Sequence, residues 1–133
     1  MTKRFLLIGC ITGMTAVIFG AFGAHFLKRV LSPDHLQLFE TGIRYQFYHT
    51  FAILVTALLC RYSNRKWTTV AGWLFLAGIF FFSGSLYLLA LVQFLELEPT
   101  QRILGPLTPL GGLLFIGGWL ALMRSSIDYK PKK

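Results

Sequence analysis

The sequence predicts an all-α integral membrane protein: four transmembrane helices in an up-down bundle, with an amphipathic outer helix that leads into the second span. The 133-residue chain is 55% hydrophobic and has a mean hydropathy of +0.62. Its apolar residues form four long runs, and every Lys, Arg, Asp and Glu lies between these runs or at the chain ends. A soluble core would need polar residues on the outer faces of such helices, whereas a bilayer requires apolar faces and internally hydrogen-bonded backbones.

We expect one membrane domain covering residues 1–133, because the spans and their short connections use nearly the whole chain. The spans are predicted at about residues 5–27, 42–60, 67–95 and 103–123, and residues 127–133 form a polar, basic tail. A cleaved signal peptide is the alternative for the first span, since residues 1–4 are basic and residues 21–23 form an acceptable cleavage pattern. We favour a retained helix, because its apolar run continues to Leu27.

The first predicted helix carries a stripe of small residues spaced 4, 3, 4 and 3 apart, which places them on one helical face. Small residues let two helices approach closely in lipid, where packing replaces the hydrophobic effect. We therefore predict helix contacts at these positions and at three glycines of the later spans, and we expect Leu at Gly13 or Gly20 to destabilise the bundle. The predicted packing residues are Gly9, Gly13, Ala16, Gly20, Gly23, Gly78, Gly111 and Gly118.

The second predicted helix begins at Ser32, followed by Pro33 and Asp34, which is typical of an N-cap, a first helical position and an acidic first turn. Glu40 and Arg44 are four residues apart and can pair. The uncharged residues 45–60 cover only ~24 Å at the helical rise. Part of the amphipathic stretch at residues 32–44 is therefore expected to complete the crossing.

The third run is long enough for a tilted helix, and Gly105, Pro106 and Pro109 predict an irregular start to the fourth. Nine Lys and Arg residues fall on the side of the two termini and of the loop at 61–66, against four on the other side. This asymmetry predicts a multi-pass protein of the inner (plasma) membrane with both termini in the cytoplasm.

Polar side chains within or near the spans gather in the predicted outer half of the bundle. We predict that His25, Tyr45, His49 and Ser85 line one outward-open polar pocket, since intramembrane histidines often mark pathways or ligand sites. The alternative is a structural network that only fixes the register of the helices. The candidate residues are His25, Glu40, Arg44, Tyr45, Gln46, Tyr48, His49, Ser83, Ser85, Tyr87 and Thr108.

No catalytic residue, metal site or cofactor is predicted. The sequence has no G-x-S-x-G, Walker or Rossmann motif, and its only two cysteines, Cys10 and Cys60, form no C-x-x-C pair. The net charge of +8 comes from basic residues at span ends, so we do not expect nucleic-acid binding. Haem ligation by His25 and His49 is a second alternative function.

Five motifs in order resemble those of a known family of small four-helix membrane proteins, catalogued as domain of unknown function 423. They are Gly20-Ala-Phe-Gly-Ala-His25, Thr41-Gly-x-x-Tyr45-Gln-x-Tyr48-His49, Ala71-Gly-Trp-Leu-Phe-Leu-Ala-Gly-Ile79, Phe82-Ser-Gly-Ser-Leu-Tyr-Leu-Leu-Ala90 and Thr108-Pro-Leu-Gly-Gly112. The resemblance covers roughly residues 5–123 and implies a four-span integral membrane protein of bacterial inner membranes. It implies no activity, substrate or catalytic residue.

The predicted function is therefore non-enzymatic. We expect a small integral membrane protein that acts through helix–helix contacts, as a homo-oligomer or as an accessory subunit of a membrane complex. Its expected partners are the lipid bilayer and either other membrane subunits or further copies of itself. A small transporter or channel that uses the outer polar pocket is the first alternative.

Overall fold

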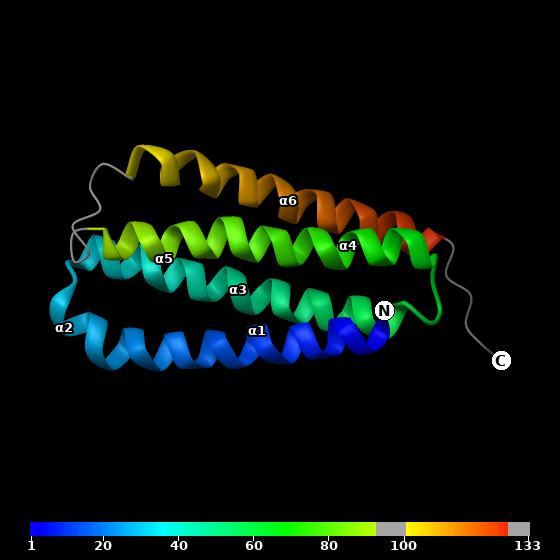
Figure 1. Ribbon diagram of the computed structural model, residues 1–133, viewed down its shortest axis with the longest axis horizontal. Helices are drawn as coiled ribbons and strands as arrows, with labels where there is room; N and C mark the ends of the chain where they lie inside the picture. Colours follow the sequence, from blue (N-terminus) through cyan, green and yellow to red (C-terminus); the bar gives the residue numbers. More distant parts are fainter. Residues whose placement is uncertain (93–100, 128–133) are drawn as a thin grey trace.

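The computed structural model describes residues 1–92 and 101–127, and the regular structure of this part is all helical, which confirms the predicted all-α fold. The helical segments form four rods, each antiparallel to the next along the chain (Figure 1). The first rod contains α1 (Thr2–Phe22), the π-helix η1 (Gly23–Leu27) and α2 (Lys28–Val30); the second is α3 (Pro33–Leu59); the third contains α4 (Arg65–Gly78), the π-helix η2 (Ile79–Ser83) and α5 (Gly84–Leu91); the fourth is α6 (Gln101–Ile127).

The predicted start of the second helix is confirmed. The Ser32 side chain accepts a hydrogen bond from the backbone N–H of His35, and Pro33 occupies the first turn. From there α3 continues without a break through the amphipathic stretch and the apolar run. The outer helix and the second span are thus one helix of 27 residues.

Two features of the rods differ from the sequence expectation. The π-helical segments η1 and η2 interrupt the first and third rods, and no residue pattern had indicated them. The irregular start expected at Gly105–Pro109 is absent, because α6 begins at Gln101 and includes both Pro106 and Pro109. Transmembrane helices tolerate proline when other groups satisfy the freed backbone carbonyls.

Within residues 1–92 and 101–127, three segments are long and apolar enough to cross a membrane, namely Thr2–Val30, Arg65–Leu91 and Leu104–Ile127. The polar residues of α3 lower its hydropathy below that of these three, although α3 packs along α1 and along the α4–η2–α5 rod (Figure 1). The last predicted residues of the third span, 93–95, and the tail residues 128–133 lie outside the described residues. Ile127, expected in the tail, is the last residue of α6.

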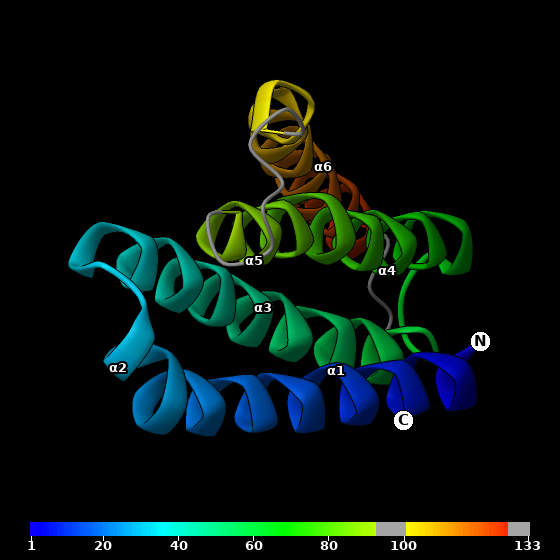
Figure 2. The same cartoon turned by 60° about the vertical axis from the view of Figure 1, so that its left-hand side comes forward.

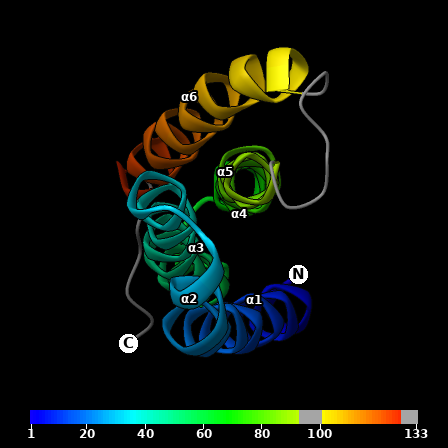
Figure 3. The ribbon, with the colours of Figure 1, turned by 90° about the vertical axis from the view of Figure 1, so that its left-hand side faces the viewer.

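The rods do not close into a square bundle. α3 and the α4–η2–α5 rod occupy the middle; α1 packs mainly on α3, and α6 packs mainly on α4, η2 and α5. Figure 3 shows α1 and α6 on opposite sides of this central pair. Side chains such as Phe5, Ile53, Phe75 and Phe115 fill the core, whereas many large apolar side chains point outward, as lipid-facing positions require.

Candidate functional site

Most of the predicted packing glycines lie where another rod approaches. A Cβ on Gly9 would collide with the Leu54 side chain, one on Gly118 would lie 2.6 Å from the Phe75 ring, and one on Gly23 would lie 3.3 Å from the Phe39 ring. The closest approach is at Gly111, where an added Cβ would meet the backbone of Phe82. Small residues at these sites are therefore required by the helix–helix distances within one chain.

The remaining predicted packing positions also lie against other parts of the chain, with one exception. Ala16 is fully buried, a Cβ on Gly78 would collide with the Phe115 ring, and a Cβ on Gly13 would lie 3.4 Å from the Thr50 side chain. At Gly20 an added Cβ would meet no atom within 4 Å. The expected contact at Gly20 is therefore wrong for the isolated chain, because a hollow lined by Gly20, Ile43 and Arg44 separates this part of α1 from α3.

Gln46 is the centre of a hydrogen-bonded junction between three rods. Its Nε2 donates to the backbone carbonyl of Thr12 at 2.8 Å and to Oγ1 of Thr15 at 2.9 Å, both on α1. Its Oε1 accepts from the Tyr87 hydroxyl of α5 at 2.7 Å. Thr50 Oγ1 donates to Thr12 Oγ1 at 2.9 Å one turn further along α3. Since Gln46 is only 4% exposed, these partners replace the water that its amide would otherwise need.

His49 forms the second polar cluster, three residues after Gln46 on α3. Its Nδ1 lies 2.8 Å from the Tyr45 carbonyl, which can only accept, so Nδ1 carries a proton. The Trp119 indole N–H of α6 donates to Nε2 at 3.4 Å. The imidazole also stacks on the Phe115 ring, with a centroid distance of 3.4 Å and an interplanar angle of 6°. Both ring nitrogens of the neutral side chain are thus engaged.

Tyr45 and His49 border a hollow of about 400 Å³ between α3, η2 and α6. Aromatic rings form most of its wall, and the Tyr45 ring lies 4.5 Å from that of Phe82. The residues that line it are Tyr45, His49, Phe82, Gly112, Phe115, Ile116 and Trp119.

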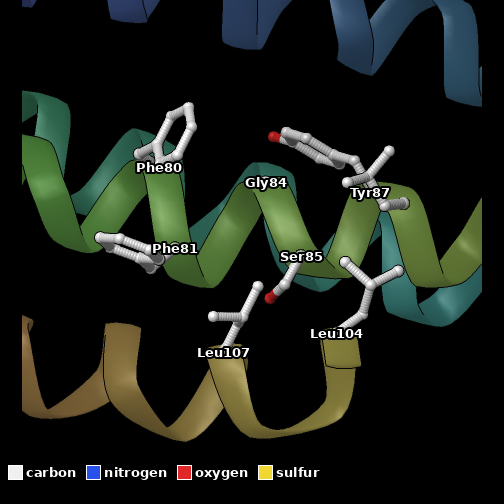
Figure 4. Close-up of a pocket in the computed structure, with 8 residues that line it drawn as sticks. Phe80, Phe81, Gly84, Ser85, Tyr87, Leu104 and Leu107 are labelled. Carbon is white, nitrogen blue, oxygen red and sulfur yellow. The ribbon is translucent and has the colours of Figure 1, made fainter. Parts of the chain in front are cut away.

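Ser85 belongs to a different hollow, of about 330 Å³, between α5 and the first turns of α6 (Figure 4). Its hydroxyl donates to the Phe82 carbonyl at 2.9 Å and lies 2.7 Å from Thr108 Oγ1 on α6. In Figure 4 the Ser85 hydroxyl points toward α6, whereas the Tyr87 ring lies on the side of α1. Ser83 is fully buried within η2, and its hydroxyl has no hydrogen-bond partner in the described part of the chain.

The expected single pocket is therefore not formed. Tyr45 and His49 share one hollow, Ser85 lines another, and His25 is exposed on η1. The physical reason is the rotation of each helix about its own axis. Residues at the same height in the bundle can still point to different sides of their rods. Tyr48 is 59% exposed on the surface of α3.

Glu40 and Arg44 line a further hollow between α1 and α3. The ion pair that their spacing allows does not form among the described residues. Instead, Arg44 donates to Oγ1 of Thr41 at 3.1 Å.

Four important polar residues were absent from the sequence prediction: Thr12, Thr15, Thr50 and Trp119. Three are threonines inside apolar runs, where a hydroxyl usually bonds to its own helix, as Thr12 also does to the Ile8 carbonyl at 3.0 Å. The fourth is Trp119 of α6, whose indole N–H donates to His49. The sequence feature that could have indicated this role is the indole N–H of Trp119, because an indole N–H in apolar surroundings needs a hydrogen-bond acceptor and His49 offers one.

The chain matches the family described as "Protein of unknown function (DUF423)" over residues 19–112. It is 42% identical over 129 residues to UPF0382 membrane protein SH2409 of Staphylococcus haemolyticus, which covers 96% of this chain and 98% of the relative. UPF0382 membrane protein SERP0230 of Staphylococcus epidermidis is 44% identical with the same coverage. The chain belongs to this family.

A third relative, UPF0382 membrane protein YwdK of Bacillus subtilis, is 41% identical over 128 residues, which is 96% of this chain and 98% of the relative. These relatives are named as membrane proteins, and together with the apolar helices they confirm that the protein is a helical membrane protein. No solved structure matches the chain. The family description assigns no activity, so any function must be inferred from the geometry of the helices.

Proposed function

We propose that this DUF423 protein is non-enzymatic and acts through helix–helix contacts in the membrane, as a homo-oligomer or as an accessory subunit of a larger complex. The supporting observation is a surface between α1 and α6 that the described residues leave exposed, which we call the open face. It is formed by Phe80, Gly84, Tyr87 and Leu88 of η2 and α5. Figure 2 shows this rod between α6 on one side and α3 on the other, with α1 beyond α3.

The open face has the shape and composition that a membrane helix needs. Phe80 is 74% and Leu88 43% exposed, while a Cβ on Gly84 would meet no atom within 4 Å. Two hollows of about 330 and 320 Å³ adjoin at Phe80, Gly84 and Tyr87, one reaching α6 and the other reaching α1. Surface glycine between larger side chains lets a second backbone approach closely, which is how helices associate in lipid.

The small-residue stripe of α1, by contrast, is already used for contacts within the chain, because Gly9, Ala16 and Gly23 pack against other parts of it. We therefore assign the contact to the open face. The proposal includes four membrane crossings with both termini in the cytoplasm, which the distribution of Lys and Arg residues supports.

Gly84→Leu tests the proposal, because it should fill the open face while the chain still folds. Leu88→Cys in a Cys10→Ser, Cys60→Ser background should crosslink in native membranes, either to a second copy or to a partner subunit identified by mass. Gly84→Leu should abolish that crosslink. Gly20→Leu is the matched control, since Gly20 is equally unobstructed but lies on another surface. A protein that stays monomeric and uncrosslinked would refute the proposal.

The transporter or channel alternative has less support. Its motivation was one outward-open polar pocket, but the candidate residues are divided among several hollows and largely hydrogen-bonded to one another. Flux of ions or small solutes into liposomes that contain the purified protein would favour this alternative.

Haem ligation also has little support. Both ring nitrogens of His49 are engaged, by the Tyr45 carbonyl and the Trp119 indole, and His25 is exposed on a different rod. A Soret band in protein purified from haem-sufficient cells would favour haem binding.

A further inference from the structure

A hollow of about 320 Å³ lies between α1 and the α4–η2–α5 rod, and Gln46 of α3, which is 4% exposed, forms its floor. Its sides are apolar: Phe19 borders it from α1, and Leu76, Ile79 and Phe80 border it from α4 and η2. An apolar cavity of about 150 Å³ is enough to hold one benzene molecule. The hollow therefore has room for about a dozen non-hydrogen atoms.

The polar side chains that line this hollow already use their hydrogen-bond donors. Both N–H protons of Gln46 Nε2 go to α1, one to the Thr12 carbonyl and one to Thr15 Oγ1. The Tyr87 hydroxyl donates to Gln46 Oε1. Each of the two threonine hydroxyls donates to a backbone carbonyl one turn earlier on α1. The lining residues therefore offer a ligand no free side-chain donor.

The oxygen atoms of the same side chains can still accept hydrogen bonds. An amide or hydroxyl oxygen has two lone pairs, and Gln46 Oε1 accepts one bond, from Tyr87, within the described part of the chain. Thr15 Oγ1 likewise accepts one, from Gln46. None of the residues that line the hollow is charged. The complementary ligand is therefore a hydrogen-bond donor, and an anion or a molecule with acceptors alone does not match the hollow.

We propose that this hollow binds a neutral amphiphile whose apolar chain ends in a free hydroxyl, as in a long-chain alcohol. The hydroxyl donates to the second lone pair of Gln46 Oε1, and the chain lies against Phe19, Leu76 and Phe80. A neutral head is favoured over an ammonium because the lining residues supply no opposite charge. The α1 wall of the hollow is not part of the open face, so this site does not depend on a partner there.

A pair of probes that differ only in the donor tests this selectivity. Decanol can donate one hydrogen bond, whereas decyl methyl ether has the same chain and oxygen but no O–H. Decanoate also lacks a donor at neutral pH and adds a negative charge. We expect decanol to be preferred over both by about fivefold, the usual effect of one neutral hydrogen bond.

Photolabelling of the full chain in detergent micelles measures this preference. Each probe carries a diazirine in its chain, the labelled fraction is read from the intact mass, and peptide mapping locates the label. The alcohol should label α1 and η2, at residues such as Phe19 and Phe80 that border the hollow. The ether is the more apolar probe and enters micelles at least as readily, so partitioning cannot produce a preference for the alcohol.

Thr15→Val is the decisive variant, because it removes the acceptor of one Gln46 N–H and so creates a free donor in the hollow. That N–H can donate to the ether oxygen, and the ratio of alcohol to ether labelling should fall to about one. Tyr87→Phe also removes one hydroxyl but frees only acceptor capacity on Gln46, so the alcohol should stay preferred. Thr41→Val removes a hydroxyl of α3 outside the hollow and should leave the ratio unchanged.

Equal labelling of the wild type by decanol and its methyl ether overturns the proposal, as does a preference that survives Thr15→Val or is lost in Tyr87→Phe. Stronger labelling by a decylamine probe overturns the assignment to a neutral hydroxyl. Thr15→Val should leave the Leu88→Cys crosslink of the open face intact. A lost crosslink with an intact alcohol preference, or the reverse, therefore separates the failure of one proposal from the failure of the other.

Discussion

At the scale of single residues, polar side chains connect the rods where apolar packing is incomplete. Both ends of the Gln46 amide form hydrogen bonds: its N–H₂ group donates two to α1, and its oxygen accepts one from α5. An amide without these partners would be costly in a membrane interior, because no water can replace them. Gln46 therefore fixes both the rotation of α3 and its register against two neighbours.

Gln46→Leu should lower the free energy of unfolding by about 1–2 kcal/mol, because it removes three inter-helix hydrogen bonds worth about 0.6 kcal/mol each. Tyr87→Phe should cost about a third of this, since it removes one. Unfolding in mixed detergent micelles measures both. Gln37→Leu, at an exposed position of α3, is the control, and equal stability of the two Gln→Leu variants would show that the junction contributes nothing.

At the scale of elements, the decisive contact is that between α6 and the π-helix η2. The backbone of Phe82 lies so close to Gly111 that no side chain fits between the two rods. The contact involves backbone on one side and a glycine on the other, so neither partner can give way without separating the rods.

Gly111→Ala should therefore destabilise the protein by about 1–3 kcal/mol, the usual cost of overpacking. Gly105→Ala is the matched control on the same helix, because its Cβ would meet no atom within 4 Å. There the alanine should be neutral or should stabilise α6 by up to about 1 kcal/mol through helix propensity. Thermal unfolding in detergent distinguishes them, and equal midpoints for the two variants would contradict the close approach.

At the scale of the whole molecule, the charge distribution determines which side of the membrane the termini face. Whether α3 crosses the membrane determines the number of crossings. If α3 crosses the membrane, four crossings bring both termini to one side, and the nine-to-four distribution of Lys and Arg places that side in the cytoplasm. If α3 does not cross, three crossings put the termini on opposite sides.

A reporter that is active only outside the cytoplasm should therefore be inactive when fused after Lys133. A cysteine introduced at Thr2 in a cysteine-free background should resist a membrane-impermeant label until the cells are opened. An active reporter together with a protected Thr2→Cys would show an odd number of crossings, and α3 would then lie on the membrane surface.

The features that could be predicted from the sequence are those that depend on interactions between residues close together in the chain. The apolar runs required helices in a membrane, and the Ser32–Pro33 pair set the start of α3, because each depends only on nearby residues. The spacing of Gly9, Ala16 and Gly23 likewise indicated a packing face, which α3 covers.

The sequence by itself thus determined the fold class, the membrane environment and the small-residue faces. Only the tertiary structure decided which polar groups meet: Gln46 with Thr12 across 34 positions, and His49 with Trp119 across 70. It also divided the expected pocket, leaving His25 on one rod and Ser85 in a separate hollow. The reason is that partners far apart in the chain depend on the rotation and register of whole helices, which η1 and η2 alter by changing the helical repeat.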